Sequence, residues 1–324
     1  MNKQAILQKL NLSLPVVASP MFIVSQLDLV RACCYNGIVG TFPALNQRTT
    51  EGFEQWLIEL NEEFAKHEKD TGEKLPPYGV NLIVHRTNPR AMIDLEVCVK
   101  HKVPILITSL GAVKELVEEV HSYGGLVFHD VTNKRHAQKA IAAGVDGLIL
   151  VSAGAGGHAG TLNPIPFVAE TREIFDGLIL LGGSLSNGKD VAAALQMGAD
   201  LAYMGTRFIS TDEAVASEGY QRMIIESGTK DIVYTAALSG IPANFLGQSL
   251  LNSGFTEDLW DRKVKIDLGA ELDTEAKAWK DIWSAGQGVA TIKDRLPVAE
   301  LVSRMKEEFR EAILSQQKYL ERYG

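Results

Sequence analysis

The sequence is poor in cysteine, and this shortage excludes two classes of small scaffold. Its 324 residues include three cysteines, Cys33, Cys34 and Cys98, and their spacing is not that of a metal site. Neither a disulfide framework nor a zinc site is supported, and we expect no bound metal. The three side chains are interpreted as small buried apolar groups.

Clustered positive charge is also missing. The chain carries 32 Lys and Arg against 40 Asp and Glu, a net charge of −8, and no dense basic cluster interrupts this acidic balance. Nucleic acid is therefore not an expected partner. The chain is otherwise an ordinary globular sequence, 46% hydrophobic, and it is long enough for one large barrel domain or two smaller domains.

Long apolar runs are absent as well. No segment has the apolar length of a membrane span, and the first residues lack the apolar core and cleavage site of a secretory signal. We therefore expect a cytoplasmic protein without a membrane partner, and a homodimer is compatible with the sequence.

Short β-branched runs alternate with segments of helical period along the first two thirds of the chain, which predicts β/α units around a parallel sheet. The predicted strands are residues 15–18, 38–41, 78–84, 103–108, 126–130, 147–151, 178–181 and 201–204. The predicted helices include residues 51–67, 89–101, 113–123, 134–143, 166–175 and 190–197. Eight such strands favour an α/β fold of the (β/α)8 TIM barrel type. A doubly wound sheet is the alternative, but its glycine fingerprint is missing after the first strand.

The alternation of predicted strands and helices stops at about residue 211, which predicts a further structural unit. Residues 211–284 read as a mixed, mainly helical insertion that lies over the barrel mouth as a lid or substrate domain, with a charged stretch at 258–267. Residues 297–323 repeat apolar positions at helical spacing and are predicted to form the closing helix of the barrel. The expected division is therefore 1–210 for the barrel, 211–284 for the insertion, and 285–324 for a segment that returns to the barrel.

The most informative stretch is residues 151–160, where glycines flank a single histidine after a predicted strand. Glycines such as Gly156 and Gly157 let the backbone approach a flat or phosphorylated ligand. His158 carries a side chain that changes charge near neutral pH. The pattern predicts a cofactor site with a catalytic group, and the alternative is a glycine-rich turn with a solvated histidine.

Other polar and glycine residues stand at the predicted strand ends, where TIM barrels place their chemistry. Loops after the seventh and eighth strands commonly bind phosphate through backbone N–H groups, so Gly182, Gly183, Gly205 and Thr206 predict a site for a phosphorylated cofactor. Asn81 lies within the third predicted strand and Ser109 stands at the end of the fourth, although Asn81 or the Gly182-Gly183 pair alone would also suit a plain turn.

Taken together, these motifs resemble one known family. They are Ser19-Pro20-Met21, Gly79-Val80-Asn81-Leu82, Ala155-Gly156-Gly157-His158-Ala159-Gly160, Leu181-Gly182-Gly183, Met204-Gly205-Thr206-Arg207-Phe208 and Trp283-Ser284-Ala285-Gly286-Gln287. The chain is similar over nearly its whole length to the FMN-dependent nitronate monooxygenases. Related FMN-dependent enoyl-acyl-carrier-protein reductases and NADH:quinone reductases share this architecture, so the motifs indicate FMN and the fold more sharply than the reaction.

The resemblance implies roles for individual residues. His158 would face the reactive side of the flavin ring as the catalytic group. The implied ring contacts are Pro20, Met21, Phe22 and Asn81, and the implied phosphate contacts are Gly157, Gly183, Gly205 and Thr206. Further candidates for cofactor contact are Ser109, Gly156, Gly182 and Gln287.

Two positions depart from the family pattern. Some relatives have a lysine where this chain has Asp130, so a cation that could stabilise an anionic reduced flavin is missing. The family often has an arginine where Asn244 stands, so its anchoring of a charged substrate or acyl carrier does not carry over.

The resemblance implies oxidation of alkyl nitronates, and possible use of nitroalkanes, with molecular oxygen as co-substrate. His158 would serve either as a neutral base or as a protonated group that binds the anion, and the sequence leaves both roles open. The alternative is an NAD(P)H-dependent FMN reductase acting on a quinone or an enoyl thioester. A flavin-binding module without turnover is a third reading, and the intact histidine disfavours it.

Overall fold

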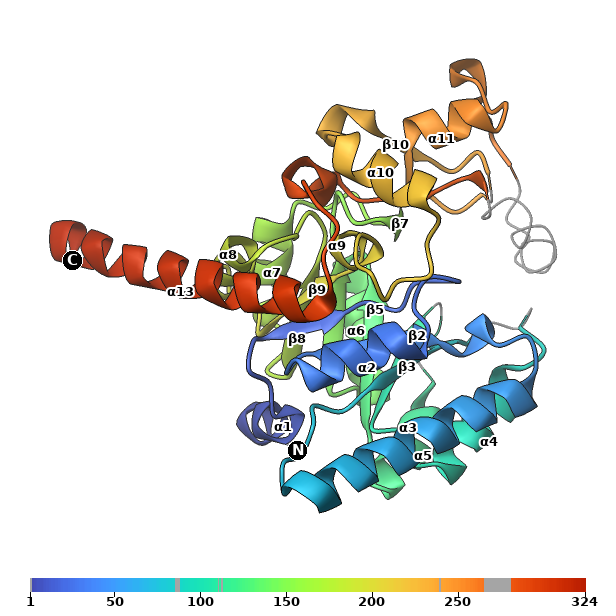
Figure 1. The fold of residues 1–324 in the computed structure, drawn as a ribbon, viewed down its shortest axis with the longest axis vertical. Helices are drawn as coiled ribbons and strands as arrows, with labels where there is room; N and C mark the ends of the chain where they lie inside the picture. The colour runs from blue at the N-terminus through green and yellow to red at the C-terminus, as the bar shows by residue number, and fades with distance from the viewer. Residues whose placement is uncertain (1, 85–87, 110, 112, 239, 265–280) are drawn as a thin grey trace.

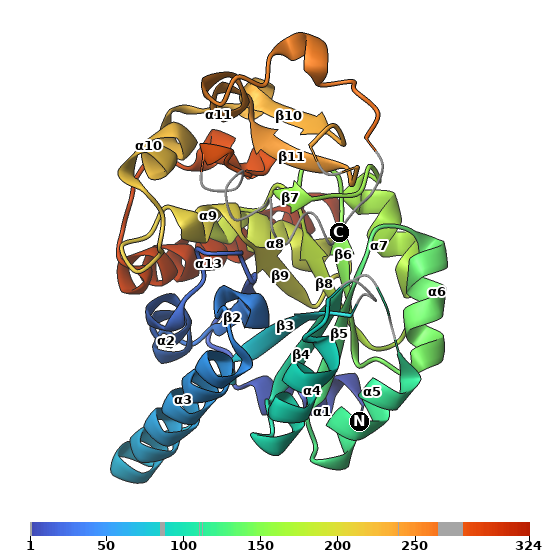
Figure 2. The same ribbon diagram turned by 90° about the vertical axis from the view of Figure 1, so that its right-hand side faces the viewer.

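The computed structural model describes residues 2–84, 88–109, 111, 113–238, 240–264 and 281–324. Eight parallel strands close into a barrel in the order β1-β2-β3-β4-β5-β6-β8-β9, and β1 pairs with β9 to complete it (Figures 1 and 2). The barrel strands are β1 (Val16–Ala18), β2 (Val39–Pro43), β3 (Gly79–Ile83), β4 (Ile105–Ser109), β5 (Leu126–Val131), β6 (Gly147–Val151), β8 (Leu178–Gly182) and β9 (Leu201–Met204). The predicted TIM barrel is confirmed, and β6 and β9 begin and end at the predicted residues.

Helices follow the strands and cover the outside of the barrel, except for the first helix, which precedes β1 and packs Ile6 and Leu10 with the barrel interior. They are α1 (Lys3–Leu10), α2 (Leu27–Tyr35), α3 (Thr50–Thr71), α4 (Ala91–Lys100), α5 (Lys114–Ser122), α6 (Lys134–Ala143), α7 (Pro164–Arg172), α8 (Gly188–Gln196) and α9 (Thr206–Ile209), with the short 3-10 turn η1 (Ala44–Asn46) after β2. Local sequence sets their ends. In α6, for example, the Asn133 side chain accepts from the backbone N–H of His136, and Gly144 ends the helix in the left-handed conformation.

The strand side chains alternate between two cores, as the two-residue period of a strand requires. One alternate set fills the barrel interior with residues such as Val39, Ile107 and Phe128. The other set packs outward against the helices, with Val80 and Leu106 among its members. Because the interior is packed, ligands are confined to the end of the barrel where the strands finish.

The segment after α9 contains more β-structure than its sequence suggested. Its strands β10 (Ile232–Thr235) and β11 (Ala243–Leu246) pair antiparallel, and β11 also pairs with β7 (Gly157–His158) from the histidine loop. Its helical elements are α10 (Glu218–Glu226), η2 (Thr229–Asp231), α11 (Gly247–Asn252) and η3 (Glu257–Leu259). Residues 265–280, which include the end of the charged stretch 258–267, lie outside the described residues. The three-part domain division remains our proposal.

The chain returns to the barrel through η4 (Gln287–Thr291) and the long helix α13 (Val298–Tyr323), which packs against α8 and α2 and then extends beyond the body of the molecule (Figure 1). Val298, Leu301 and Met305 bury their side chains in the same cluster as Leu29 of α2 and Val191 of α8. The predicted closing helix is therefore confirmed. Among the described residues, no helix is long and apolar enough to cross a membrane.

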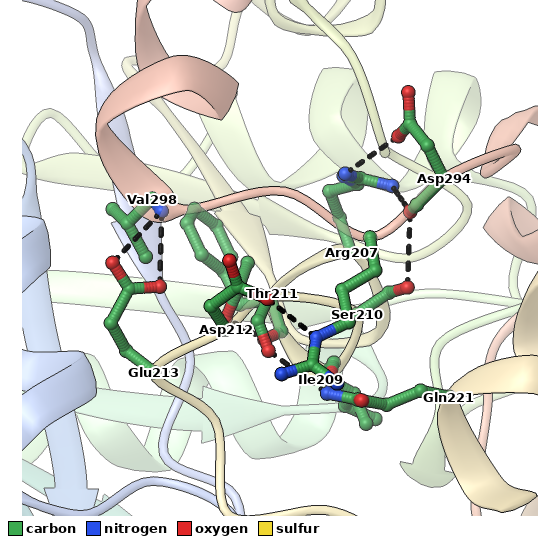
Figure 3. A network of polar contacts seen from close by, with 11 residues as sticks. Arg207, Ile209, Ser210, Thr211, Asp212, Glu213, Gln221, Asp294 and Val298 are labelled. Carbon is green, nitrogen blue, oxygen red and sulfur yellow. Dashed lines mark hydrogen bonds and ion pairs between the residues drawn. The ribbon is translucent and has the colours of Figure 1, made fainter. Parts of the chain in front are cut away.

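A buried polar network attaches this returning segment to α9 (Figure 3). The Arg207 guanidinium donates to the Asp294 backbone oxygen at 3.0 Å and to its carboxylate at 3.1 Å. Arg304 binds the same carboxylate from α13 at 2.6 Å. At the start of α13, the Val298 N–H donates to the carboxylate of Glu213. The network fixes the segment that directly follows Thr206.

Candidate active site

A cavity of about 1500 Å³ opens at the carboxyl ends of the barrel strands and continues beneath the β7-β11-β10 sheet. Twelve of the thirteen site residues predicted from the sequence line it. They are Pro20, Met21, Phe22, Asn81, Ser109, Gly156, Gly157, His158, Gly182, Gly183, Gly205 and Thr206. The thirteenth, Gln287, is not among the lining residues. Its backbone N–H instead donates to the Gly154 oxygen at 2.9 Å, so it braces the histidine loop from outside.

The loop after β1 is held open toward the cavity by a neighbouring asparagine. The Asn46 amide donates to the Met21 oxygen at 3.2 Å, and its Oδ1 accepts from the N–H of Ile23 at 2.8 Å. Ile23 adopts φ +67°, a left-handed conformation that is costly for a β-branched residue. This conformation leaves Phe22 39% exposed on the cavity wall, where an apolar ring can stack on a flat ligand.

The cavity floor is polar and runs across three neighbouring strands. The Asn81 amide donates to Ser109 Oγ at 2.9 Å, and that hydroxyl donates to Asp130 Oδ2 at 2.6 Å. Burial raises the pKa of Asp130 to about 6, and the bond from Ser109 opposes this effect only in part. Sequence analysis identified Asn81 and Ser109 as ligand contacts, and the structure adds Asp130 as their partner.

Tyr203 from β9 also lines this floor, and sequence analysis missed it. Burial, and then the nearby charge of Asp130, raise the pKa of its phenol well above the ordinary value. The sequence could have indicated this position. Leu201 points into the barrel interior, and Tyr203, two residues later on the same strand, must point to the same side. Gly182 on β8 makes room for it, since a Cβ there would lie 3.2 Å from Tyr203 Cδ1.

Backbone N–H groups are concentrated at the ends of β8 and β9. Within the described residues, the N–H groups of Gly183, Gly205 and Thr206 donate to no backbone oxygen outside their own elements. Gly183 has φ +124°, and a Cβ there would lie 2.5 Å from Ser152 Oγ. A Cβ on Gly205 would lie 2.6 Å from Ser19 Oγ. Unpartnered N–H groups around bare backbone are what a phosphate group requires.

Glycines also let two loops of the chain pack directly against each other. A Cβ on Gly286 would lie 2.4 Å from the Gly154 oxygen, and a Cβ on Gly156 would lie 2.8 Å from the Gly286 nitrogen. Thr206 completes this contact, because its hydroxyl accepts from the N–H of Gly286 at 2.9 Å. Gly157 differs, since it has φ +66° and its missing Cβ would meet no atom within 4 Å.

His158 lies in the two-residue strand β7 on the cavity wall. Water reaches the ring through the cavity, but protein atoms surround it closely enough that desolvation lowers the pKa of its imidazole. The imidazole is therefore neutral at pH 7. Its side chain makes no hydrogen bond to the described residues, so both ring nitrogens remain available to a ligand.

The backbone of the histidine loop is held by the inserted segment. Ala243 on β11 pairs with His158, and the Asn244 amide donates to the Ala155 oxygen at 2.6 Å. Tyr234 on β10 donates its hydroxyl to the Ala159 oxygen at 3.2 Å. Asn244, which replaces the family arginine, thus acts on the loop backbone rather than on a charged ligand.

The described residues contain no group of three or more His, Cys, Asp or Glu side chains that could hold a metal ion. The three cysteines are free and buried. The chemistry of the cavity therefore depends on its glycines, on His158, and on the polar floor around Asp130.

Comparison with known proteins agrees with this geometry. A profile of the nitronate monooxygenase family matches residues 3–308. The chain is 27% identical to a nitronate monooxygenase of Paraburkholderia phytofirmans, with 96% of each protein covered. It is 26% identical to a nitronate monooxygenase of Neurospora crassa, with 96% of this chain and 94% of that protein covered.

Solved structures share the fold. The chain superposes on FabK from Thermotoga maritima with a TM-score of 0.79 at 22% identity, covering 97% of this chain and 98% of that one. Nitroalkane oxidase from Streptomyces ansochromogenes gives a TM-score of 0.78 at 24% identity, covering 94% and 98%. Members of the matched family are flavin-dependent oxidoreductases, and this chain belongs to the nitronate monooxygenase family.

Proposed function

We propose that the protein is an FMN-dependent nitronate monooxygenase that oxidises alkyl nitronates, and nitroalkanes after deprotonation, with molecular oxygen. The observation that supports this most directly is the position of His158, a neutral imidazole with both ring nitrogens available on the wall of a glycine-lined cavity. Family membership supplies the reaction class.

The residues of the cavity fit FMN rather than FAD, which carries a second nucleotide. The bare backbone at Gly183 and Gly205, with the N–H of Thr206, suits one terminal phosphate. Phe22 and Met21 offer apolar surface to a ring, while Asn81 and Ser109 offer polar groups to its edge. When bound, FMN would accept electrons from the substrate and pass them to oxygen.

His158 is assigned the proton transfer. A neutral imidazole can accept the α-proton of a nitroalkane, whereas an imidazolium would be needed to bind a preformed anion by charge. Because desolvation lowers the pKa of His158, the base role is favoured at pH 7. The β7-β11 pairing holds the backbone of His158 at the cavity wall.

Anaerobic mixing tests the proposal. We expect the purified protein to be yellow, to release FMN on denaturation, and to lose its visible flavin absorbance with propionate 3-nitronate but not with NADH. Rapid bleaching by NADH with no response to a nitronate would contradict it and favour the reductase alternative. Mass spectrometry that finds FAD instead of FMN would contradict the assignment of the phosphate end.

We also propose that the protein works in the cytoplasm. Cys33 and Cys34 are adjacent, buried and free, which suits a reducing compartment. Cell fractionation with detection of the flavin checks this placement.

A further inference from the structure

Asp130 is a buried carboxyl group at the cavity floor that the proposed reaction does not use. Its Oδ2 accepts from Ser109, but its Oδ1 is shielded from water and has no hydrogen-bond partner. The described residues contain no ion pair to Asp130. An ionised carboxylate without a cation or full hydration is costly, so the group depends on what water reaches it from the cavity.

The other titratable groups around Asp130 do not supply the missing charge. On β5, burial lowers the pKa of His129 to about 4, so its ring is neutral above that range. On β9, Tyr203 is a neutral phenol. His158 on β7 is neutral at pH 7, and His136 on α6 is bonded to Thr132 and Asn133. Lys139 of α6 also borders the cavity, but it forms no ion pair with Asp130.

We propose that Asp130 is a flavin-contacting residue that is protonated in the complex, so that this protein binds the flavin ring together with one proton. The inference rests on the FMN enzyme proposed above. Asp130 is half-buried, and a ring that lies over the floor would remove the access to solvent that this residue keeps through the cavity, so the uncharged acid loses far less on being covered than the carboxylate. The binding equilibrium then has three reactants, the apoprotein with ionised Asp130, the flavin and one proton from solvent. Its product is the complex with neutral Asp130.

The pH dependence of binding follows from this balance. Because burial raises the pKa of Asp130 to about 6, the apoprotein is largely ionised above that pH and must take up the proton on binding. Affinity for the ring should therefore fall about tenfold for each pH unit above this range. Asp130→Asn cannot ionise, so its affinity should stay nearly constant with pH and should exceed that of the wild type at pH 8.

Riboflavin is the probe of choice, since the phosphate of FMN itself titrates near pH 6 and would obscure the signal. Fluorescence titration of the full-length apoprotein from about pH 5 to about pH 8 gives the affinity. Calorimetry of the wild type in two buffers of different ionisation enthalpy counts the protons directly, which keeps the test decisive even if the variant folds poorly. We expect uptake of close to one proton per riboflavin at pH 8 in the wild type and none in Asp130→Asn.

Matched variants assign the proton. Asp176→Asn removes an exposed carboxylate on the barrel surface and should leave the wild-type pH dependence intact. His158→Asn and His136→Asn should do the same, because neither ring is the proton carrier. If the dependence disappears in either histidine variant, or if wild-type binding takes up no proton, the role of Asp130 is overturned.

The outcomes also separate this inference from the proposed function. A protein that binds neither riboflavin nor FMN contradicts both. A protein that binds FMN and oxidises nitronates, yet binds riboflavin with no proton uptake, contradicts only the role of Asp130. A wild-type affinity that falls with pH, beside a flat response in Asp130→Asn, supports it.

Discussion

Two polar regions differ in how their charged groups are paired, one around Arg207, which follows Thr206 in the chain, and one on the cavity floor around Asp130. In the Arg207 network, the guanidinium forms an ion pair with the carboxylate of Asp294 (Figure 3). Arg304 adds a second cation to the same carboxylate. On the cavity floor, Asp130 has one hydroxyl donor and no cation within the described residues. The carboxylate of Asp294 has two cationic partners within the chain, whereas the carboxyl group of Asp130 on the cavity floor has none among the described residues.

This contrast predicts that changes to the network alter stability and that changes to the cavity alter chemistry. Arg207 is 2% exposed, lies directly after Thr206 and is not among the residues that line the cavity, so the network supports the end of β9 from outside it. Single substitutions in each region can separate the two effects.

The largest effect is expected at His158. His158→Asn retains a hydrogen-bonding side chain but cannot accept a proton near neutral pH, so turnover of a neutral nitroalkane should fall about 10²–10⁴-fold. FMN content and the free energy of unfolding should stay close to wild type. Because a preformed nitronate has no α-proton to lose, its turnover should fall less. Steady-state kinetics with both substrates measures the difference, and equal losses on both would show that the histidine binds the anion instead.

The next largest effect is expected in the paired network. Arg207→Met removes a buried guanidinium and both of its hydrogen bonds to Asp294, and should lower the free energy of unfolding by about 3 kcal/mol. Arg295→Met, which breaks the exposed pair with Asp212, should change it by no more than about 1 kcal/mol. Urea unfolding gives both values. The contrary result is a variant Arg207→Met that is as stable as the wild type but no longer binds FMN. It would show that the network acts on cofactor binding and not on stability.

A smaller effect concerns the free energy of unfolding as a function of pH, to which the adjacent residues His129 and Asp130 contribute with opposite slopes. The folded-state pKa of His129, about 4, lies below its ordinary value of 6.5, so its contribution makes the folded state more stable as pH rises from about 4 to 6.5. The folded-state pKa of Asp130, about 6, lies above its ordinary value of 3.8, so its contribution makes the folded state less stable as pH rises from about 3.8 to 6.

The two contributions offset between about pH 4 and about pH 6 in the wild-type apoprotein. Asp130→Asn removes only the falling contribution, so over this range its free energy of unfolding should rise by roughly 2 kcal/mol more than that of the wild type. His129→Gln should reveal the opposite slope. Urea unfolding at several pH values checks both variants, and parallel curves for all three proteins would contradict the assignments.

The smallest effect is expected where the insertion holds the histidine loop. Asn244→Ala removes the donor to the Ala155 oxygen, which should cost about 1 kcal/mol of stability and lower turnover roughly tenfold through a less well positioned His158. Gln248→Ala, an exposed amide on α11, is the control and should change neither. Equal activity of the two variants would show that the β7-β11 pairing alone positions the ring.

The barrel could be predicted from sequence because each strand carries its own signal. Residues such as Ile149 and Leu180 belong to apolar β-branched or leucine-rich runs bounded by turns, and the alternation with helices is visible at short range. Strand β10 had a comparable signal in Ile232-Val233-Tyr234-Thr235, but the helical surroundings outweighed it. Strand β7 has no such signal, because Gly157 and His158 form a strand only through pairing with residues far along the chain.

The site was predicted less completely for the same reason. Motifs placed His158 and the glycines of β8 and β9 at the cavity, since strand ends of a parallel barrel meet at one face. The motifs did not distinguish the roles of Gly156 and Gly157. Gly156 allows two loops to pack against each other, whereas a side chain at Gly157 would meet open space. The motifs also placed Gln287 at the cofactor, whereas its position depends on a hydrogen bond to Gly154 that no local pattern encodes.

The antiparallel register between Ala243 and His158 has a consequence for how this enzyme can diversify. Successive side chains of a strand point to opposite faces, so a slip of one residue would exchange the faces of His158 and Gly157. Insertions or deletions between β10 and β11 are therefore tolerated only if they leave this pairing in place. Substitutions on the exposed side of the inserted segment leave this pairing intact, whereas a change of length next to β11 would move the backbone that pairs with His158.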